Sequence, residues 1–300
     1  MKVDSKIIVA GIAIVVVLAI IAVIGAACCA CVFCAWTGNW NWGNWGGYAQ
    51  TEHRVDKTVQ AGADNIELEV DTIAGNVEIQ ESAVSDVTVT YDIFGPAGRL
   101  NDIRTGTSGV NVNNDTVRIR AEARLNPGIL LIGKYGAHVT VMVPKNSSYS
   151  LTLHTLGGDI KVPPLQGTSV YMDTLGGKLS LNGGRYETVY LNTAGGDIFA
   201  SYEATNATFK TLGGKIEVDT TQTTGTLNAN TKGGNIAVTL PSETLFTIDA
   251  STLGGHVRHG SIRMTPTSEN DWTFAGQTEG GAGSLKITLK TMGGDIDIGY

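Results

Sequence analysis

Cysteine, proline and positive charge are all scarce in this sequence of 300 residues. Its four cysteines lie between Cys28 and Cys34, so no disulfide can brace the rest of the chain. Only 7 prolines occur, and 21 lysines and arginines stand against 28 aspartates and glutamates, for a net charge of −7. Nucleic-acid binders need a basic stripe, so this balance argues against nucleic acid as a partner.

Helical periodicity and clustered catalytic side chains are lacking beyond the first 34 residues. A glycine-rich phosphate loop must open a helix, and no helical pattern follows any of the glycine pairs. The histidines are dispersed and do not converge on a predicted metal site. We therefore expect no catalytic residues, no metal and no cofactor, and we predict that the chain is not an enzyme.

What the sequence has instead is a repeat, the four-residue pattern Thr-x-Gly-Gly. It returns about every twenty residues, a period typical of stacked coils that cannot bury their apolar faces alone. Paired glycines suit a sharp corner because glycine adopts positive φ without steric cost. The predicted corner residues are Thr72 and Gly75 of a degenerate copy, Thr72-Ile73-Ala74-Gly75, and then Thr155, Gly157 and Gly158; Thr174, Gly176 and Gly177; Thr193, Gly195 and Gly196; Thr211, Gly213 and Gly214; Thr231, Gly233 and Gly234; Thr252, Gly254 and Gly255; and Thr291, Gly293 and Gly294.

Apolar residues alternate with polar ones on both sides of each corner. Around Thr155, for example, they lie four and two residues before the threonine and five and seven residues after it. Period-two alternation indicates short strands with one buried face, so Leu191, Phe209 and Ile216 are expected to point inward. The predicted fold is all-β: a single-domain, β-helix-like solenoid over residues 61–300, whose first coil contains the degenerate copy.

A different pattern occupies the start of the chain. Ile7 to Ala27 carry no polar or charged side chain, and a helix of this length spans a hydrocarbon core of about 30 Å. A cleaved secretory signal is the alternative, although its apolar core is normally about 7–15 residues. Because Lys2 and Lys6 precede the span, we predict a cytoplasmic N-terminus at 1–6, one transmembrane anchor helix at 7–34 and an extracytoplasmic remainder at the cell membrane.

Cysteines and tryptophans cluster around the outer end of the predicted span. For the cysteines three interpretations stay open: helix filler, a lipid attached to Cys28, or a metal or intermolecular disulfide. Four of the five tryptophans lie in residues 36–45. They indicate an interfacial belt that leads into a Gly/Asn-rich tether over residues 35–60, and a carbohydrate-binding strip is the alternative.

Three segments interrupt the repeat. Residues 92–115 and 124–136 are rich in Gly, Asn and Asp and are expected to be long connections, and residues 263–284 separate the last two corners. The apolar run at 128–133 is expected to cover the open first coil, because an unpaired strand edge invites aggregation; contact with a membrane or a partner is the alternative. The strand that ends at Tyr300 is expected to form the final coil, either covered by 263–284 or available for self-association.

Charged residues recur directly after the glycine pairs. In coils stacked at about 4.8 Å, Asp159, Lys178, Asp197 and Lys215 would form an outward column of alternating acid and base. Such a charge ladder relieves like-charge repulsion and helps to fix the register. In an enzyme the two aspartates would act as a pair, but they would lie about 10 Å apart with a lysine between them. Candidate glycosylation sites, each opening an Asn-x-Ser/Thr triplet, are Asn114, Asn146 and Asn206.

The run from Val139 through Ile296 resembles a known family. Here Val-Thr-Val-Met-Val-Pro leads into Leu-Thr-Leu-His-Thr-Leu-Gly-Gly-Asp-Ile-Lys-Val and then into repeated Thr-x-Gly-Gly-x-Ile units. The pattern is similar to that of the bacterial and archaeal putative-adhesin family, a β-strand-repeat domain of unknown function, and covers most of residues 60–300. The resemblance implies a β-helix-like solenoid at the cell envelope with an adhesion role, and it carries over no catalytic residues.

These observations favour a membrane-anchored, extracytoplasmic solenoid that acts without catalysis in surface adhesion or envelope structure. Besides the membrane, we expect a surface glycan or an envelope protein as partner. One alternative is a sensor or accessory subunit that binds a membrane partner, since the predicted cytoplasmic segment is too short to signal alone. The other is a polysaccharide-acting enzyme, which would need acids and a base to converge on adjacent coils.

Overall fold

The computed structural model describes residues 49–60, 63–83, 85–96, 98–113, 115–126, 135–270 and 272–300. Residues Tyr48–Tyr300 form one compact unit. The predicted anchor, the four cysteines and the tryptophan-rich segment lie outside the described residues. Within the described ranges, no helix has both the length and the apolar character needed to cross a membrane.

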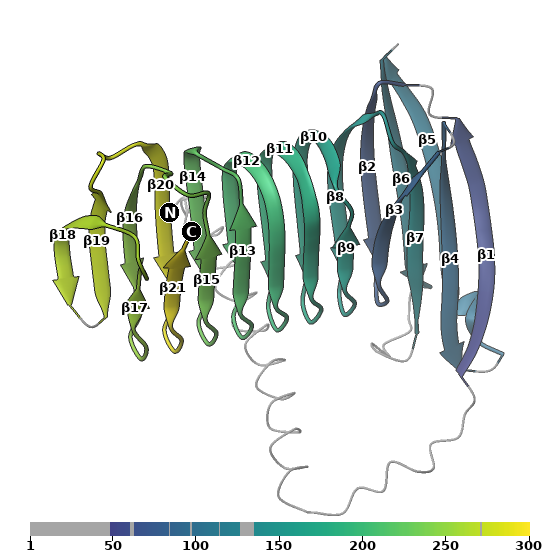
Figure 1. Ribbon diagram of the computed structural model, residues 1–300. Coiled ribbons are helices and arrows are strands. Elements are labelled where there is room, and N and C mark those ends of the chain that lie inside the picture. Colours follow the sequence, from purple (N-terminus) through teal and green to yellow (C-terminus); the bar gives the residue numbers. More distant parts are fainter. Residues whose placement is uncertain are drawn as a thin grey trace, which may run out of the picture. The chain divides into compact units, whose positions relative to one another are not determined.

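The described part of the chain is built almost wholly from strands (Figure 1). One short 3-10 helix, η1 (Leu100–Asp102), precedes the fifth strand. The strands are β1 (Ala49–Gln60), β2 (Asn65–Thr72), β3 (Val77–Ser82), β4 (Asp86–Pro96), β5 (Ile103–Asn113), β6 (Thr116–Leu125), β7 (Gly136–Pro144), β8 (Ser148–Thr155), β9 (Ile160–Val162), β10 (Leu165–Thr174), β11 (Leu179–Thr193), β12 (Ile198–Lys210), β13 (Ile216–Thr220), β14 (Thr224–Asn230), β15 (Ile236–Thr239), β16 (Phe246–Ser251), β17 (Val257–Arg258), β18 (Met264–Asn270), β19 (Thr273–Thr278), β20 (Ser284–Lys290) and β21 (Ile296–Gly299).

Each coil contributes one strand before its corner and one strand after it, and these strands form two parallel arrays. The first sheet, before the corners, runs in the order β6, β2, β8, β10, β11, β12, β14, β20, β16. The second sheet runs β7, β3, β9, β11, β12, β13, β15, β21, β17. The long strands β11 and β12 pass from the second sheet into the first. The all-β, solenoid-like fold predicted from the repeat is confirmed.

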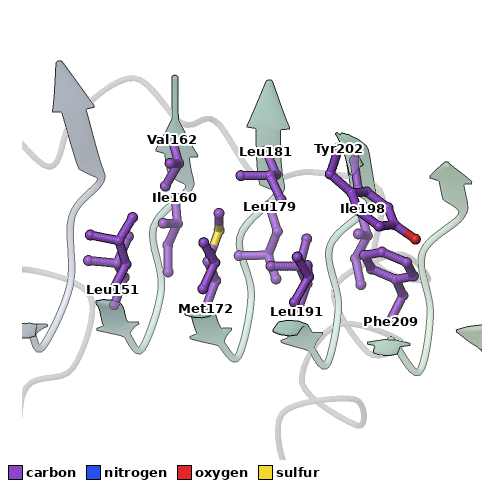
Figure 2. Packing of buried hydrophobic residues seen from close by; sticks show 14 of the residues in the cluster. Leu151, Ile160, Val162, Met172, Leu179, Leu181, Leu191, Ile198, Tyr202 and Phe209 are labelled. Atoms are coloured by element: carbon purple, nitrogen blue, oxygen red, sulfur yellow. The ribbon is translucent and has the colours of Figure 1, made fainter. Parts of the chain in front are cut away.

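The core lies between the two sheets and is filled by the alternating apolar residues. Side chains alternate between the two faces of a strand, so every second residue enters the core. Leu191, Phe209 and Ile216 are fully buried, as predicted. Figure 2 shows side chains from both sheets packed together, among them Leu151, Met172, Leu191 and Phe209 from the first sheet and Ile160, Leu179 and Ile198 from the second.

At the N-terminal end, the order of the coils in space differs from their order along the chain. The coil of β2 and β3, which contains Thr72, was expected to come first but lies second, because β6 and β7 pair with its outer edges. Antiparallel strands then flank this outermost coil: β5 pairs with β6, and β4 pairs with β7 and with β1. The parallel stack therefore ends in antiparallel pairs.

The C-terminal end shows the same inversion. Strands β20 and β21 lie between the β14–β15 coil and the β16–β17 coil. The expectation that the strand ending at Tyr300 forms the final coil is therefore wrong, because the last strands of the chain fill a gap one coil inside the end. The hairpin of β18 and β19, within residues 263–284, pairs antiparallel with the outer edge of β16.

Two segments whose sequences lack a clear alternation of apolar residues, and which were predicted to be a connection and part of the tether, form strands in the structure. Most of residues 92–115, expected to be a connection, belongs to β4 and β5, and residues 49–60, assigned to the tether, form β1. Most residues of β5 are exposed, so this strand lacks the apolar alternation by which strands are recognised. It is held by backbone pairing with β6. The apolar run at 128–133 lies outside the described residues, and its covering role stays a prediction.

Candidate functional site

Each corner is organised around a buried threonine. In the seven full motifs, the hydroxyl of the threonine donates to the carbonyl oxygen of the last glycine of the neighbouring coil's corner, at 2.8–3.1 Å. The same hydroxyl accepts the backbone N–H of the second glycine of its own corner, at 3.1–3.4 Å. The threonine thus satisfies two buried backbone groups and ties each corner to the next coil.

The second glycine of each corner is required by close stacking, not by its φ angle. Of the corner glycines, only Gly75 has a positive φ, 111°. The prediction that the pairs serve positive φ is therefore wrong for the full motifs. A Cβ on Gly177 would lie 1.8 Å from the carbonyl oxygen of Gly158, and the other second glycines are as tightly placed, at 1.8–2.2 Å. The first glycine is open: a Cβ on Gly176 would meet nothing within 4 Å.

The residues after the corners form a column, but its contacts differ from acid–base pairing. The carboxylate of Asp159 accepts the backbone N–H of Lys178 at 2.8 Å, and that of Asp197 accepts the N–H of Lys215 at 2.9 Å. Among the described side chains, no ion pair joins Lys178 to either aspartate. Further along, the order is Asn235, Asp295, His256, since β20 and β21 lie inside the last coil; Asn235 accepts from Asp295 and Asp295 accepts from His256.

The two lysines of the column contact an aromatic ring instead. Lys178 Nζ lies 3.9 Å from the ring centroid of Phe199, and Lys215 Nζ lies 4.7 Å from the same centroid. Lys215 also pairs with Glu217 at 2.7 Å, which raises the pKa of the lysine. The aspartates thus bind backbone while the lysines cover an outward-facing Phe199, and the column holds adjacent coils in register.

A partly exposed cluster of aromatic and polar side chains lies on the outer face of the first sheet. We call it the tyrosine patch, and it comprises His154, Tyr171, Asp173, Tyr190, Asn192 and Lys210. Tyr171 and Tyr190 share one register position and stack with ring centroids 4.9 Å apart and planes 2° apart. The His154 ring lies 5.3 Å from Tyr171, and Lys210 Nζ lies 5.3 Å from the centroid of Tyr190. The stacked faces are thus covered, and edges and hydroxyl groups remain for a ligand.

The polar groups of the patch lie beside this stack. Asn192 Nδ2 donates to Asp173 Oδ1 at 2.5 Å, and His154 Nδ1 lies 3.8 Å from Asp173 Oδ2. Burial raises the pKa of the Tyr171 hydroxyl, and the electrostatic influence of Asp173 and Tyr190 raises it further. The patch offers hydroxyl, amide, carboxylate and ammonium groups, which suit a ligand rich in hydroxyl groups.

The tyrosine patch was not among the residues predicted from the sequence, although the repeat contains its signal. Tyr171 and Tyr190 each lie three residues before a corner threonine, and Asp173 and Asn192 each lie one residue before it. Residues at one offset meet only when the coils stack in register, which the pairing of β10 with β11 provides. Aligning the repeats by their corners would have placed the two tyrosines in one column.

The remaining predicted site residues do not converge with this patch. Asn146 is exposed in the turn between β7 and β8, and Asn206 is exposed within β12, where its Oδ1 accepts from Thr226 Oγ1 at 2.9 Å. Asn114 lies outside the described residues. In the ranges that the structure describes, no three His, Cys, Asp or Glu side chains are grouped as a metal site.

The coils, the corner columns and the antiparallel ends define an all-β repeat protein of the β-solenoid-like class. Within that class, the chain belongs to the family described as Toastrack DUF4097, whose model matches residues 64–224 and 201–299. The resemblance stated from the repeat is thereby confirmed. No curated protein matches the chain.

Three solved structures illustrate the similarity, at low identity and with low TM-scores. A putative cell adhesion protein from Clostridium sporogenes is 13% identical with a TM-score of 0.38, over 83% of this chain and 99% of the other. A putative adhesin from Bacteroides fragilis is 14% identical with a TM-score of 0.36, over 83% and 97%. A putative lipid binding protein from Parabacteroides distasonis is 16% identical with a TM-score of 0.36, over 83% and 96%.

Proposed function

We propose that this chain is a non-enzymatic adhesion module of the cell envelope, anchored by residues 7–34 and displaying its solenoid outside the cytoplasm. The tyrosine patch is the binding surface in this proposal, and a surface glycan is its ligand. The family membership supports the class of module, and the apolar span with Lys2 and Lys6 supports the anchoring and the orientation.

The observation that carries the proposal is the preorganised geometry of the patch. Its groups come from strands of four adjacent coils, β8, β10, β11 and β12, whose register is set by backbone pairing and by the corner columns. A rigid surface loses little conformational entropy when it binds. Because Tyr171 and Tyr190 cover each other, the patch contacts a glycan through hydrogen bonds from phenol, amide and ammonium groups, not by stacking a ring face on a sugar.

Binding of a fluorescent glycan panel to intact cells that carry the full chain tests this proposal. We expect Tyr190→Ala and Asn192→Ala each to weaken binding about tenfold, equivalent to about 1.4 kcal/mol. Asn228→Ala is the matched control, since Asn228 is exposed in the same outward column on β14, beyond the patch. Unchanged binding in both patch variants would refute the patch, and binding to the purified chain but not to intact cells would refute display outside.

A further inference from the structure

A line of exposed apolar side chains follows the corner edge of the solenoid. These are the residues at the x position of Thr-x-Gly-Gly, and we call them the corner ridge. Leu175 is 58% exposed, Leu253 70% and Met292 52%, and Leu156 and Leu212 are 41% and 48% exposed. Figure 1 shows the corners in one row along one edge. In spatial order the ridge comprises Ile73, Leu156, Leu175, Ala194, Leu212, Lys232, Met292 and Leu253.

The fold itself does not require apolar residues at these positions. Ala194 and Lys232 occupy the same place in equivalent corners, so a small or a charged side chain is compatible with the corner. The corner is held by its threonine hydroxyl, its second glycine and backbone hydrogen bonds, none of which involves the side chain of the x residue. Exposed leucines and methionine at five of the eight corners therefore indicate a surface that is covered by something else.

The charges around the ridge differ between its two halves. Along the first half, Asp159, Asp173 and Asp197 lie beside the corners, together with Lys178, which packs on Phe199. Along the second half, Lys232 is on the ridge, and Lys210 and Lys290 lie directly before the threonines; all three are exposed. Asp295, the acid beside this half, is paired with Arg258 at 2.9 Å. The half that contains Leu212, Met292 and Leu253 thus combines apolar tips with lysines, the composition of surfaces that bind anionic membranes.

We propose that the corner ridge rests on the membrane bilayer, with Leu212, Met292 and Leu253 entering the acyl boundary and with Lys232 and Lys290 binding anionic lipid headgroups. The inference rests on the proposed anchoring. The folded unit begins at Tyr48, and the segment 35–47 reaches at most about 45 Å from the predicted anchor. The tether therefore keeps the ridge at a high effective concentration near the bilayer. A row of eight corners at about 4.8 Å spacing suits a flat surface, and the outer faces of both sheets remain accessible.

The test uses the full chain with its four cysteines replaced by alanine and with one new cysteine that carries an environment-sensitive fluorophore. The cysteine is placed on the ridge, as Leu212→Cys or Leu253→Cys, or at the opposite edge as a control, Thr223→Cys, an exposed position between β13 and β14. The protein is reconstituted into vesicles of phosphatidylcholine with or without phosphatidylglycerol, and flotation is measured before fluorescence.

At both ridge positions we expect blue-shifted emission and loss of fluorescence with lipid-borne quenchers. At position 223 we expect no loss of fluorescence. In vesicles without phosphatidylglycerol, the loss at the ridge positions should be several-fold smaller. Vesicles that float the chain but leave the ridge probes unquenched would overturn the ridge and leave the anchoring intact. A chain that does not float contradicts both the anchoring and the ridge. A blue shift without lipid quenching that appears only when envelope proteins are added would show a protein partner and overturn the lipid assignment.

Discussion

The central coils and the two ends of the solenoid follow different rules of pairing. From β8 to β15 the chain adds one coil after another, with the same threonine and glycine contacts at every corner. At each end the order of coils is inverted and antiparallel strands close the stack. A repeated coil leaves the same open edge after every addition, so the repeat can extend the solenoid but cannot end it.

The ends also differ from each other. At the N-terminal end antiparallel strands pair with both strands of the outer coil, β6 and β7. At the C-terminal end the β18–β19 hairpin pairs with β16 only, while β17 has two residues. Fewer pairings hold the C-terminal coil, so local opening there should require less free energy than at the N-terminal end.

The largest expected effect concerns the second glycine in a central coil. Gly177→Ala places a Cβ against the Gly158 carbonyl and should destabilise the domain by about 3 kcal/mol or more, because backbone on both sides must move. Gly176→Ala is the control and should stay within about 0.5 kcal/mol. Denaturant unfolding measures both values, and equal losses would contradict the proposed division of roles within the corner.

A smaller effect is expected from the threonine column. Thr193→Val keeps the shape but removes the hydroxyl that donates to Gly177 and accepts from Gly196, leaving buried backbone groups unpaired. The expected loss is about 1–3 kcal/mol in denaturant unfolding. Thr188→Val, on the exposed face of the same strand, is the control and should be close to neutral. A neutral Thr193→Val would mean that the column does not bind the coils together.

The smallest effect is expected at the C-terminal end and depends on pH. The backbone N–H of His256, followed by Arg258, lowers the pKa of Asp295 below its usual value. A lowered folded-state pKa stabilises the fold above the unfolded pKa of about 3.9, and this contribution is lost as the pH falls through the folded value. Thermal midpoints of Asp295→Ala and wild type should therefore differ at neutral pH and converge in acid.

Asp295→Asn separates the two contacts of this carboxylate. It keeps the oxygen that accepts from His256, as Asn235 does for Asp295, but it loses the charge that pairs with Arg258. We expect a midpoint between those of wild type and Asp295→Ala at neutral pH. A difference between wild type and Asp295→Ala that persists unchanged at low pH would contradict the assignment to the charged carboxylate.

Much of the central solenoid followed from the sequence because its signals are local. The offset of Leu191, Phe209 and Ile216 from a corner threonine gave their burial correctly, since alternation in a strand fixes which face each residue occupies. The structural role of the paired corner glycines was predicted incorrectly. Whether glycine serves φ or a close approach depends on a carbonyl in the neighbouring coil, which the motif alone does not reveal.

The candidate site was only partly accessible from the sequence. The column through Asp159 and Asp197 was expected, but its partners are backbone N–H groups and its lysines pack on Phe199. Tyr171 and Tyr190 share an offset that the repeat contains, yet their stacking depends on the register between coils. A contact between coils requires knowing which residues are opposite each other, and that is a property of the assembled sheets.

By itself, the sequence determined the period, the corners, the buried positions and the family, because each is encoded within about twenty consecutive residues. Only the tertiary structure decided which coil lies next to which at the ends. Strands β6, β7, β20 and β21 take their places out of chain order. Strands β1, β4 and β5 pair antiparallel beside β6 and β7, and the hairpin of β18 and β19 pairs antiparallel with β16. Pairing between distant segments depends on which strand edges are still unpaired, and the alternation of apolar and polar residues within a strand does not specify its partner.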